Sequence, residues 1–355
     1  MTSSSRLLTL DAVRGLAALC VVLIHLGLEY NNAELARFGH LGVDLFFVMS
    51  GFVISRAYDH KLLAGLSWQR FMLLRMARLY PSMFLGVLVG LAAYFVIPPS
   101  AYPIGLMPGG SYQLGWRSIG HFLLVPDLRA REGTFPLNGV FWSLFFELVV
   151  NLVHGLTVRR LTIFRLSVFV VPVAIWWAYT AGTAGKWGWG GGWNGPSFWG
   201  GFLRVAWAYG AGMLLHRVLA RPWRVPAIVP VALTLLIMLV PNFGLLMPRI
   251  AISVFVLCPL IVALAAGAEV PPALRGVAAW IGAISYPLYA THHPLLLMSV
   301  YRFEPAGIPG MTVAVVAVML FATIVEYVYD APVRKRLIAW ATPVTPAPEP
   351  QRRTL

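Results

Sequence analysis

In this chain of 355 residues, 59% are hydrophobic and only 11% are charged, and the mean hydropathy is +0.76. Such a composition is incompatible with an ordinary water-soluble surface, so a soluble fold of this length is excluded. The formal net charge of +14 at pH 7 raises the question of a nucleic-acid partner, which the positions of the basic residues answer below.

The apolar residues fall in ten blocks long enough to cross a bilayer, which takes roughly 20 residues per helix. Short stretches rich in Pro, Gly and Arg separate the blocks. We therefore predict an all-α fold, a polytopic transmembrane bundle of about ten helices. The predicted spans are 9–29, 41–57, 79–97, 139–156, 166–181, 198–215, 225–240, 248–266, 278–299 and 308–329.

The blocks use most of the chain, which predicts one domain over 1–340 and a Pro-rich cytoplasmic tail over 341–355. The connection 98–138 is a lid or merely a connection. Because the first block is long, carries charges and lacks a small-residue cleavage site, it is not expected to be a removable signal. Cys20 and Cys258 both lie inside apolar blocks, so neither a disulfide framework nor a metal site is predicted.

The basic residues are distributed unevenly between the two sides of the predicted bundle. With the N-terminus inside, eighteen Lys and Arg fall on cytoplasmic segments and seven on the opposite side. This is the positive-inside bias of membrane proteins. Both termini are therefore predicted to be cytoplasmic, the connection 98–138 is predicted outside, and no nucleic-acid partner is expected.

Ionisable side chains inside the spans indicate function, because each costs at least ~2.5–3.5 kcal/mol near the bilayer centre and usually faces a polar cavity. At 100° per residue, Arg14 and His25 lie ~20° apart on the first helix, with Asp11 within ~60° of both. Arg14 and His25 are separated along the axis by roughly 16 Å. The residues of this kind are Asp11, Arg14, His25, Asp44, Glu147, His292, His293 and Glu326.

The predicted orientation gives each of these residues a depth. His25, Glu147 and His292 lie ~24, ~14 and ~21 Å from the inner ends of their spans, compatible with one layer in the middle to outer half. Together with Arg14 near the inner side, they predict a polar shaft that runs from the cytoplasm to a cluster of His and carboxylate. This cluster predicts a histidine that acts as a general base, together with a carboxylate that orients the ring or accepts its proton. Purely structural roles are the alternatives for single residues: a helix-to-helix hydrogen bond for His25, an ion pair of Asp11 with Arg14, and a helix cap for Asp44.

Five motifs, in this order and spacing, make the sequence resemble the membrane-bound acyltransferase-3 family across 10–332. The family transfers an acyl group, commonly acetyl from acetyl-CoA on the cytoplasmic side, to hydroxyls of envelope glycans and some small molecules. The motifs are Leu10-Asp11-Ala12-Val13-Arg14-Gly15 with His25, the run Gly42 to Phe52, Arg75-Met76-Ala77-Arg78-Leu79-Tyr80-Pro81, Trp142-Ser143-Leu144-Phe145-Phe146-Glu147, and the run Ser285 to Pro294.

Carried over by position, the resemblance implies that His25 is the catalytic histidine, Arg14 its essential partner and Glu147 the fourth-span acid. Arg75 and Arg78 match the family's Arg-x-x-Arg. Two departures concern the lining of the acceptor side: Val150-Asn151 stands where the family usually has aromatics, and Asp330-Ala331-Pro332 replaces its Glu-x-Pro. We expect the remaining site lining from Asp11, Asp44, Ser143, Tyr286 and His292.

The residues themselves suggest how a thioester would be used. Arg75 and Arg78, three apart on one helix face, present two forks suited to the phosphates of acyl-CoA, unless they are only positive-inside anchors. An extended pantetheine arm can cover the roughly 16 Å from Arg14 to His25. His25 would then deprotonate the acceptor hydroxyl while Glu147 stabilises the imidazolium. An acyl-histidine intermediate is the competing mechanism.

The acceptor is less well indicated. Trp187, Trp189 and Trp193 in an outer loop could stack on sugar rings or form an interfacial belt. We expect a glycan or lipid-linked saccharide acceptor, membrane lipids around a multi-pass protein of the bacterial inner membrane, and acetyl-CoA or another acyl-CoA as donor without a metal. A small-molecule acceptor, a proton-coupled transporter and a non-catalytic scaffold are the alternatives.

Overall fold

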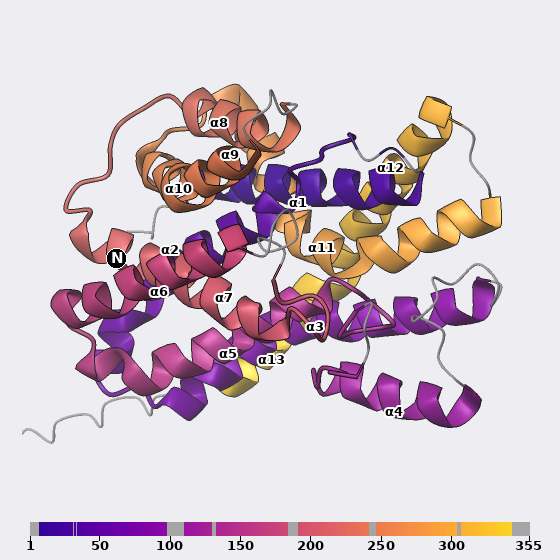
Figure 1. The fold of residues 1–355 in the computed structure, drawn as a ribbon, viewed down its shortest axis with the longest axis horizontal. Helices are drawn as coiled ribbons and strands as arrows, with labels where there is room; N and C mark the ends of the chain where they lie inside the picture. Colours follow the sequence, from indigo (N-terminus) through magenta and orange to yellow (C-terminus); the bar gives the residue numbers. More distant parts are fainter. Residues whose placement is uncertain are drawn as a thin grey trace, which may run out of the picture.

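The computed structural model consists of helices (Figure 1), and its described residues are 7–30, 32, 34–97, 110–129, 133–183, 191–240, 246–303 and 307–342. Over these ranges no strand forms beyond one isolated bridge between Pro226 and Glu269. The α-helices are α1 (Leu8–Glu29), α2 (Leu41–Leu63), α3 (Trp68–Val96), α4 (Gly110–Phe122), α5 (Phe141–Thr157), α6 (Ile163–Thr183), α7 (Phe198–Val218), α8 (Ile228–Leu239), α9 (Leu246–Ile252), α10 (Cys258–Gly267), α11 (Arg275–Phe303), α12 (Gly307–Ile324) and α13 (Ala331–Ala341).

The predicted all-α fold is confirmed, and each of the ten predicted spans coincides with a helix or a stack of helical segments. In the described part of the chain, seven segments are long and apolar enough to cross a membrane. The predicted spans on α7, α8 and α11 are outside that set. Helix α8 is apolar but only 12 residues long, whereas α7 and α11 carry polar side chains such as Arg204 and His292 that reduce their apolar character.

Several helices turn large apolar side chains outward, as expected of a protein surrounded by lipid tails. On α6, Phe164 and Ile175 are 76% and 65% exposed, and on α12 Ile308 and Val313 are 78% and 67% exposed. Apolar surface on this scale is costly in water. The chain is therefore a membrane protein.

Helices α1 and α11 pack closely together and position the polar residues of the first predicted span (Figure 1). The close approach depends on two glycines. A Cβ on Gly15 would lie 2.5 Å from the Ile281 carbonyl oxygen, and one on Gly282 would lie 2.5 Å from Asp11 Cβ. Small residues of this kind let membrane helices approach backbone to backbone, so the Asp11–Arg14 turn lies directly against α11.

The connection 98–138 is more structured than a plain loop. Helix α4 lies alongside α3 (Figure 1), and the non-helical segment 133–138 is buried. Non-helical backbone can lie inside a membrane protein only where other protein groups satisfy its hydrogen bonds.

Candidate active site

Three histidines meet between α1 and α11. The ring centroid of His25 lies 5.1 Å from that of His292 and 5.1 Å from that of His293. His292 is fully buried, whereas His25 and His293 are partly exposed. The structure thus brings the predicted His25 and His292 together and adds His293.

The hydrogen bonds of these rings determine which nitrogen of His25 is available. A carbonyl oxygen only accepts, so His25 Nδ1, 2.8 Å from Val21 O, carries the proton. His292 Nδ1 likewise donates to Leu288 O at 3.0 Å and Tyr289 O at 2.9 Å. His292 Nε2 is therefore an acceptor, and it lies 3.2 Å from His25 Nδ1. His25 Nε2 keeps its lone pair and forms no hydrogen bond with the described part of the chain, as a general base requires.

Arg14, on the same face of α1, is held by the neighbouring helix. Its Nε donates to Ser285 Oγ at 2.8 Å, and its Nη2 donates to Gly282 O at 2.7 Å. Nη2 also lies 3.0 Å from Asp11 Oδ1, and the Arg14 side chain remains 32% exposed. The predicted Asp11–Arg14 pair is present, and it orients Arg14 without burying it.

Glu147 lies at the centre of a second polar group. One carboxylate oxygen, Oε1, accepts from Arg75 Nη2 at 3.2 Å, from Asn151 Nδ2 at 3.1 Å and from the hydroxyl of Ser50. The Arg75 and Glu147 side chains are 8% and 13% exposed. With the described residues, Glu147 makes no contact to His25, so the stabilisation of a His25 imidazolium by Glu147 stays a prediction.

Arg78 differs from Arg75 in its surroundings. Arg75 is buried against Glu147, whereas Arg78 is exposed and forms neither a hydrogen bond nor an ion pair with the described part of the chain. Arg78 lies within electrostatic range of Arg75, Arg14 and Arg334. Arg334 is itself paired with Glu326 at 2.9 Å and with Asp330. Four guanidinium groups from α1, α3 and α13 thus converge, an arrangement suited to a polyanion.

Two of the predicted lining residues lie on facing helices beside the histidines. Ser143 Oγ donates to Val140 O at 3.0 Å and accepts from Tyr289 Oη at 2.6 Å. The hydroxyl of Tyr286 is buried without a partner in the described residues. A buried hydroxyl without a hydrogen bond is unfavourable, which suits a group that meets a ligand or water.

Asp44 is paired away from the histidines. Both of its carboxylate oxygens accept from Arg204, at 2.7 Å each, and both side chains are almost fully buried. Arg204 also lies over the Trp142 ring, 5.3 Å from its centroid, and donates to His40 O at 3.2 Å. Burial and the charge of Arg204 lower the pKa of His40 to about 4. Asp44 therefore joins α2 to α7 as part of a bidentate ion pair.

Only one of the three predicted acceptor tryptophans can be placed. Trp187 and Trp189 lie outside the described residues, whereas Trp193 is 38% exposed. Its carbonyl oxygen accepts from Thr134, from the amide at 2.9 Å and from the hydroxyl at 3.2 Å. The loop of Trp193 is thus fastened to the buried segment that follows α4.

That buried segment, 133–138, reaches the histidine cluster. The amide of Asn138 donates to Ala290 O at 2.8 Å and to Gly86 O at 3.3 Å. The amide N–H of Leu137 donates to Nε2 of His121 at 3.1 Å. Burial lowers the pKa of His121 to about 4, which keeps this nitrogen available as an acceptor. The segment is therefore fastened to α3, α4 and α11, and its contact on α11 lies two residues before His292.

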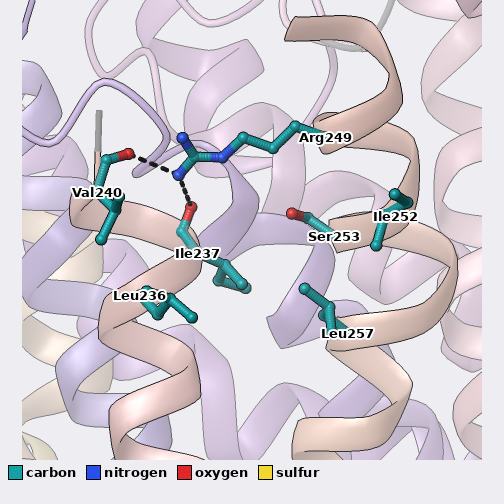
Figure 2. A pocket seen from close by; sticks show the side chains of 7 residues that line it. All are labelled: Leu236, Ile237, Val240, Arg249, Ile252, Ser253 and Leu257. Carbon is teal, nitrogen blue, oxygen red and sulfur yellow. Dashed lines mark hydrogen bonds between the residues drawn. The ribbon is translucent and has the colours of Figure 1, made fainter. Parts of the chain in front are cut away.

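A separate pocket of about 300 Å³ lies between α8 and the helical stack from α9 to α10 (Figure 2). Arg249 closes one end, donating to Val240 O at 2.6 Å and Ile237 O at 3.4 Å. The walls are otherwise mostly apolar, and none of the candidate site residues contributes to them. The lining is Leu236, Ile237, Val240, Arg249, Ile252, Ser253 and Leu257.

In the described ranges, no three His, Cys, Asp or Glu side chains converge as they would around a metal ion. A sequence family described as an acyltransferase domain matches residues 7–330. The chain belongs to this acyltransferase-3 family. The match includes His25, Arg14, Glu147 and both arginines of the Arg-x-x-Arg motif.

Two curated relatives illustrate the membership. "Protein 2 in picA locus" of Rhizobium radiobacter is 35% identical over 187 residues, which cover 48% of this chain and 91% of that protein. "Acyltransferase MdmB" of Streptomyces mycarofaciens is 30% identical over 180 residues, 44% of this chain and 42% of that protein. The chain thus aligns with less than half of the Streptomyces acyltransferase. No solved structure matches the sequence significantly.

Sequence reasoning did not assign site roles to several residues of this acyltransferase. Arg204 and Arg334 are not among the predicted site residues, although each pairs with at least one buried carboxylate. Asn151 was treated as a departure from the family pattern, yet it donates to Glu147. Its spacing of four residues from Glu147 is the signal that could have revealed it, because such residues share a helix face.

Proposed function

We propose that this acyltransferase moves an acyl group, most simply acetyl, from cytoplasmic acyl-CoA to a hydroxyl of a cell-envelope or exported glycan, in the bacterial inner membrane. The observation that carries the proposal is the tautomer of His25. Its Nδ1–H is occupied by Val21 O and His292, which leaves Nε2 as a base in an accessible side chain. Family membership makes acyl transfer the reaction that this base serves.

The site provides for each step of a direct transfer. His25 Nε2 removes the hydroxyl proton as the acceptor oxygen attacks the thioester carbonyl, the C–S bond breaks, and the proton passes to the departing thiolate. No net proton or electron is required. The guanidinium groups of Arg14, Arg78 and Arg334 would hold the donor phosphates. From Arg14 to His25 the roughly 16 Å along α1 suits an extended pantetheine arm.

The test is transfer of label from [¹⁴C]acetyl-CoA by the purified protein in proteoliposomes, with a saccharide fraction from the envelope of the source cells as acceptor. We expect alkali-labile label on the saccharide, absent with His25→Ala. If the label appears on small molecules and not on the saccharide, the acceptor is a small molecule and the glycan acceptor is refuted. Uptake of label without covalent transfer would support a transporter, and a donor that is consumed no faster than in empty liposomes would refute the proposal.

A rapid acid quench distinguishes the two chemical routes. Direct transfer predicts no protein-bound label when acceptor is omitted. The acyl-histidine route instead predicts stoichiometric label on the protein that disappears when acceptor is added. Parent and His25→Ala proteins are compared at matched folded concentration.

A further inference from the structure

Helix α5 carries a row of three polar residues that includes Glu147. Asn151 follows Glu147 by four residues and His154 follows it by seven, so all three lie on one face of the helix. Asn151 is 0% exposed and His154 is 2% exposed. A fully buried polar row needs hydrogen-bond partners throughout, and the structure supplies them.

The hydrogen bonds form an unbroken chain from Glu147 to Asp59 on α2. Asn151 Nδ2 donates to Glu147 Oε1 at 3.1 Å, and Tyr209 Oη donates to Asn151 Oδ1 at 3.2 Å. His154 Nδ1 lies 2.7 Å from Tyr209 Oη, and His154 Nε2 lies 2.8 Å from Asp59 Oδ1. Helices α2, α5 and α7 each contribute to the chain.

The direction of each hydrogen bond follows from its neighbours. A carboxylate accepts, so Asn151 must present its NH₂ to Glu147 and its oxygen to Tyr209. The Tyr209 hydroxyl donates its proton to that oxygen and therefore accepts a hydrogen bond from His154 Nδ1. Asp59 also accepts, so a chain that donates throughout toward Glu147 requires His154 to donate from both ring nitrogens, as an imidazolium does.

The far end of the chain stabilises this charge. Asp59 Oδ2 accepts from Arg217 Nη2 at 2.8 Å, from Arg217 Nε at 3.1 Å and from Ser55 Oγ at 2.6 Å. Asp59 is therefore held as a carboxylate, and it leaves Oδ1 for His154. A buried imidazolium without such a partner would be strongly unfavourable.

We propose that Asp59, His154, Tyr209 and Asn151 form a positioning relay that keeps Glu147 ionised and fixes the orientation of its carboxylate. The proposal rests on the proposed function of the site. From His154 Nδ1 through Tyr209 and Asn151 the donated N–H and O–H groups point toward Glu147, and aligned hydrogen bonds strengthen one another. His154 thus acts on the carboxylate from roughly 10 Å along α5 without touching a substrate.

Other groups also face Glu147, and they define what the relay adds. Arg75 on α3 contacts the carboxylate, Tyr209 on α7 and Tyr286 on α11 lie within electrostatic range, and Ser50 on α2 donates a hydrogen bond. Arg75 is the only cation among these. The relay supplies a second positive charge from the other side.

The test is the pH dependence of acetyl transfer in His154→Gln and Tyr209→Phe. Loss of a unit charge at ~10 Å, with an effective dielectric constant of ~20, should move the acidic limb of the rate profile up by about one pH unit in His154→Gln. His154→Lys should restore the limb in part. Tyr209→Phe should lower kcat several-fold with the KM for acetyl-CoA within about twofold, because it interrupts the chain but keeps every charge.

Thr234→Val is the matched control, since Thr234 is also fully buried but bonds only to Pro230 O of its own helix. Its profile should match that of the parent. If His154→Gln has the parental profile and merely unfolds at lower temperature, the network is a structural cross-link and the relay is refuted.

A second measurement does not depend on activity, so it separates failure of the relay from failure of the proposed function. The ¹⁵N-histidine difference spectrum of the parent and His154→Gln proteins in detergent should show two protonated ring nitrogens for His154 at pH 7.5. A neutral ring would overturn the relay even if transfer is observed. The imidazolium signal in a protein without transferase activity would instead refute the proposed function alone.

Discussion

The arginines of the Arg-x-x-Arg motif should respond differently to the same substitution. In Arg78→Gln, an exposed guanidinium that has no partner in the described residues is lost, so folding should be unaffected. A charge-assisted contact to phosphate is worth roughly 1.5–3 kcal/mol, which corresponds to a roughly 10- to 150-fold weaker affinity for acyl-CoA. Relief of repulsion from Arg14, Arg75 and Arg334 reduces any cost to stability.

Arg75→Gln removes the positive partner of a carboxylate that is 13% exposed. Breaking a buried pair by deleting one partner costs about 3–5 kcal/mol, so this variant should unfold at a clearly lower temperature. The combined Gln variant should show both effects. Lys at either position should rescue only in part, because an ammonium keeps the charge but loses the fork.

The assay is calorimetric binding of acetyl-CoA to detergent-purified protein at low and physiological salt, because screening reduces contacts at an exposed site. Acetyl-pantetheine, which has no phosphates, is the control ligand, and its affinity should be the same for parent and Arg78→Gln. If Arg78→Gln binds acetyl-CoA as tightly as the parent at both salt concentrations, Arg78 is a topological anchor and the donor phosphates bind elsewhere.

Three further expectations concern single residues. His25→Ala should abolish transfer while thermal unfolding and acetyl-CoA binding stay near parental; measurable turnover at the parental rate would remove His25 from the chemistry. Glu147→Gln should lower the rate of transfer tenfold or more, measured as initial rate at saturating donor, and an unchanged rate would make Glu147 structural. The pKa of His121 is about 4 in the fold against about 6.5 in the unfolded chain, so its contribution to stability is full above pH 6.5 and is lost as the pH falls toward 4. The protection factor of the Leu137 amide hydrogen should fall over that range, whereas in His121→Gln, which retains an accepting oxygen, it should depend much less on pH.

The helices were predictable because a run of about 20 apolar residues indicates a membrane-spanning helix without any tertiary information. Helix α4 was not, because its sequence contains Gly110, Gly115 and Gly120 and few apolar residues. Glycine disfavours helix in isolated segments, and only packing beside α3 compensates. The burial of the following segment, 133–138, depends likewise on long-range partners.

The meeting of His25 with His292 was predictable from sequence, whereas the partner of Glu147 was not. Depth arithmetic placed His25, His292 and Glu147 in one layer, and the structure joins His25 to His292. The structure pairs Glu147 with Arg75 and not with His25. Sequence gives the rise of each helix but not the rotation of one helix relative to another, so the partner of a given carboxylate stays undetermined.

The pairing of the buried charges distinguishes structural ion pairs from reactive groups in this bundle. Every carboxylate described above on these helices has a cationic partner: Arg14 for Asp11, Arg204 for Asp44, Arg217 for Asp59, Arg75 for Glu147 and Arg334 for Glu326 and Asp330. Each partner offsets the cost of burial, and burial alone therefore does not indicate a reactive group.

Two polar groups stand apart, because among the described residues they have no such partner and remain accessible. They are Nε2 of His25 and the guanidinium of Arg78, and Arg78 lies within electrostatic range of Arg14 on the same face of α1 as His25. Under the proposed function, the roughly 16 Å along α1 from Arg14 to His25 is the distance that the pantetheine arm of the donor would cover. The donor phosphates would then lie among Arg14, Arg78 and Arg334, and the acyl carbonyl would lie at His25.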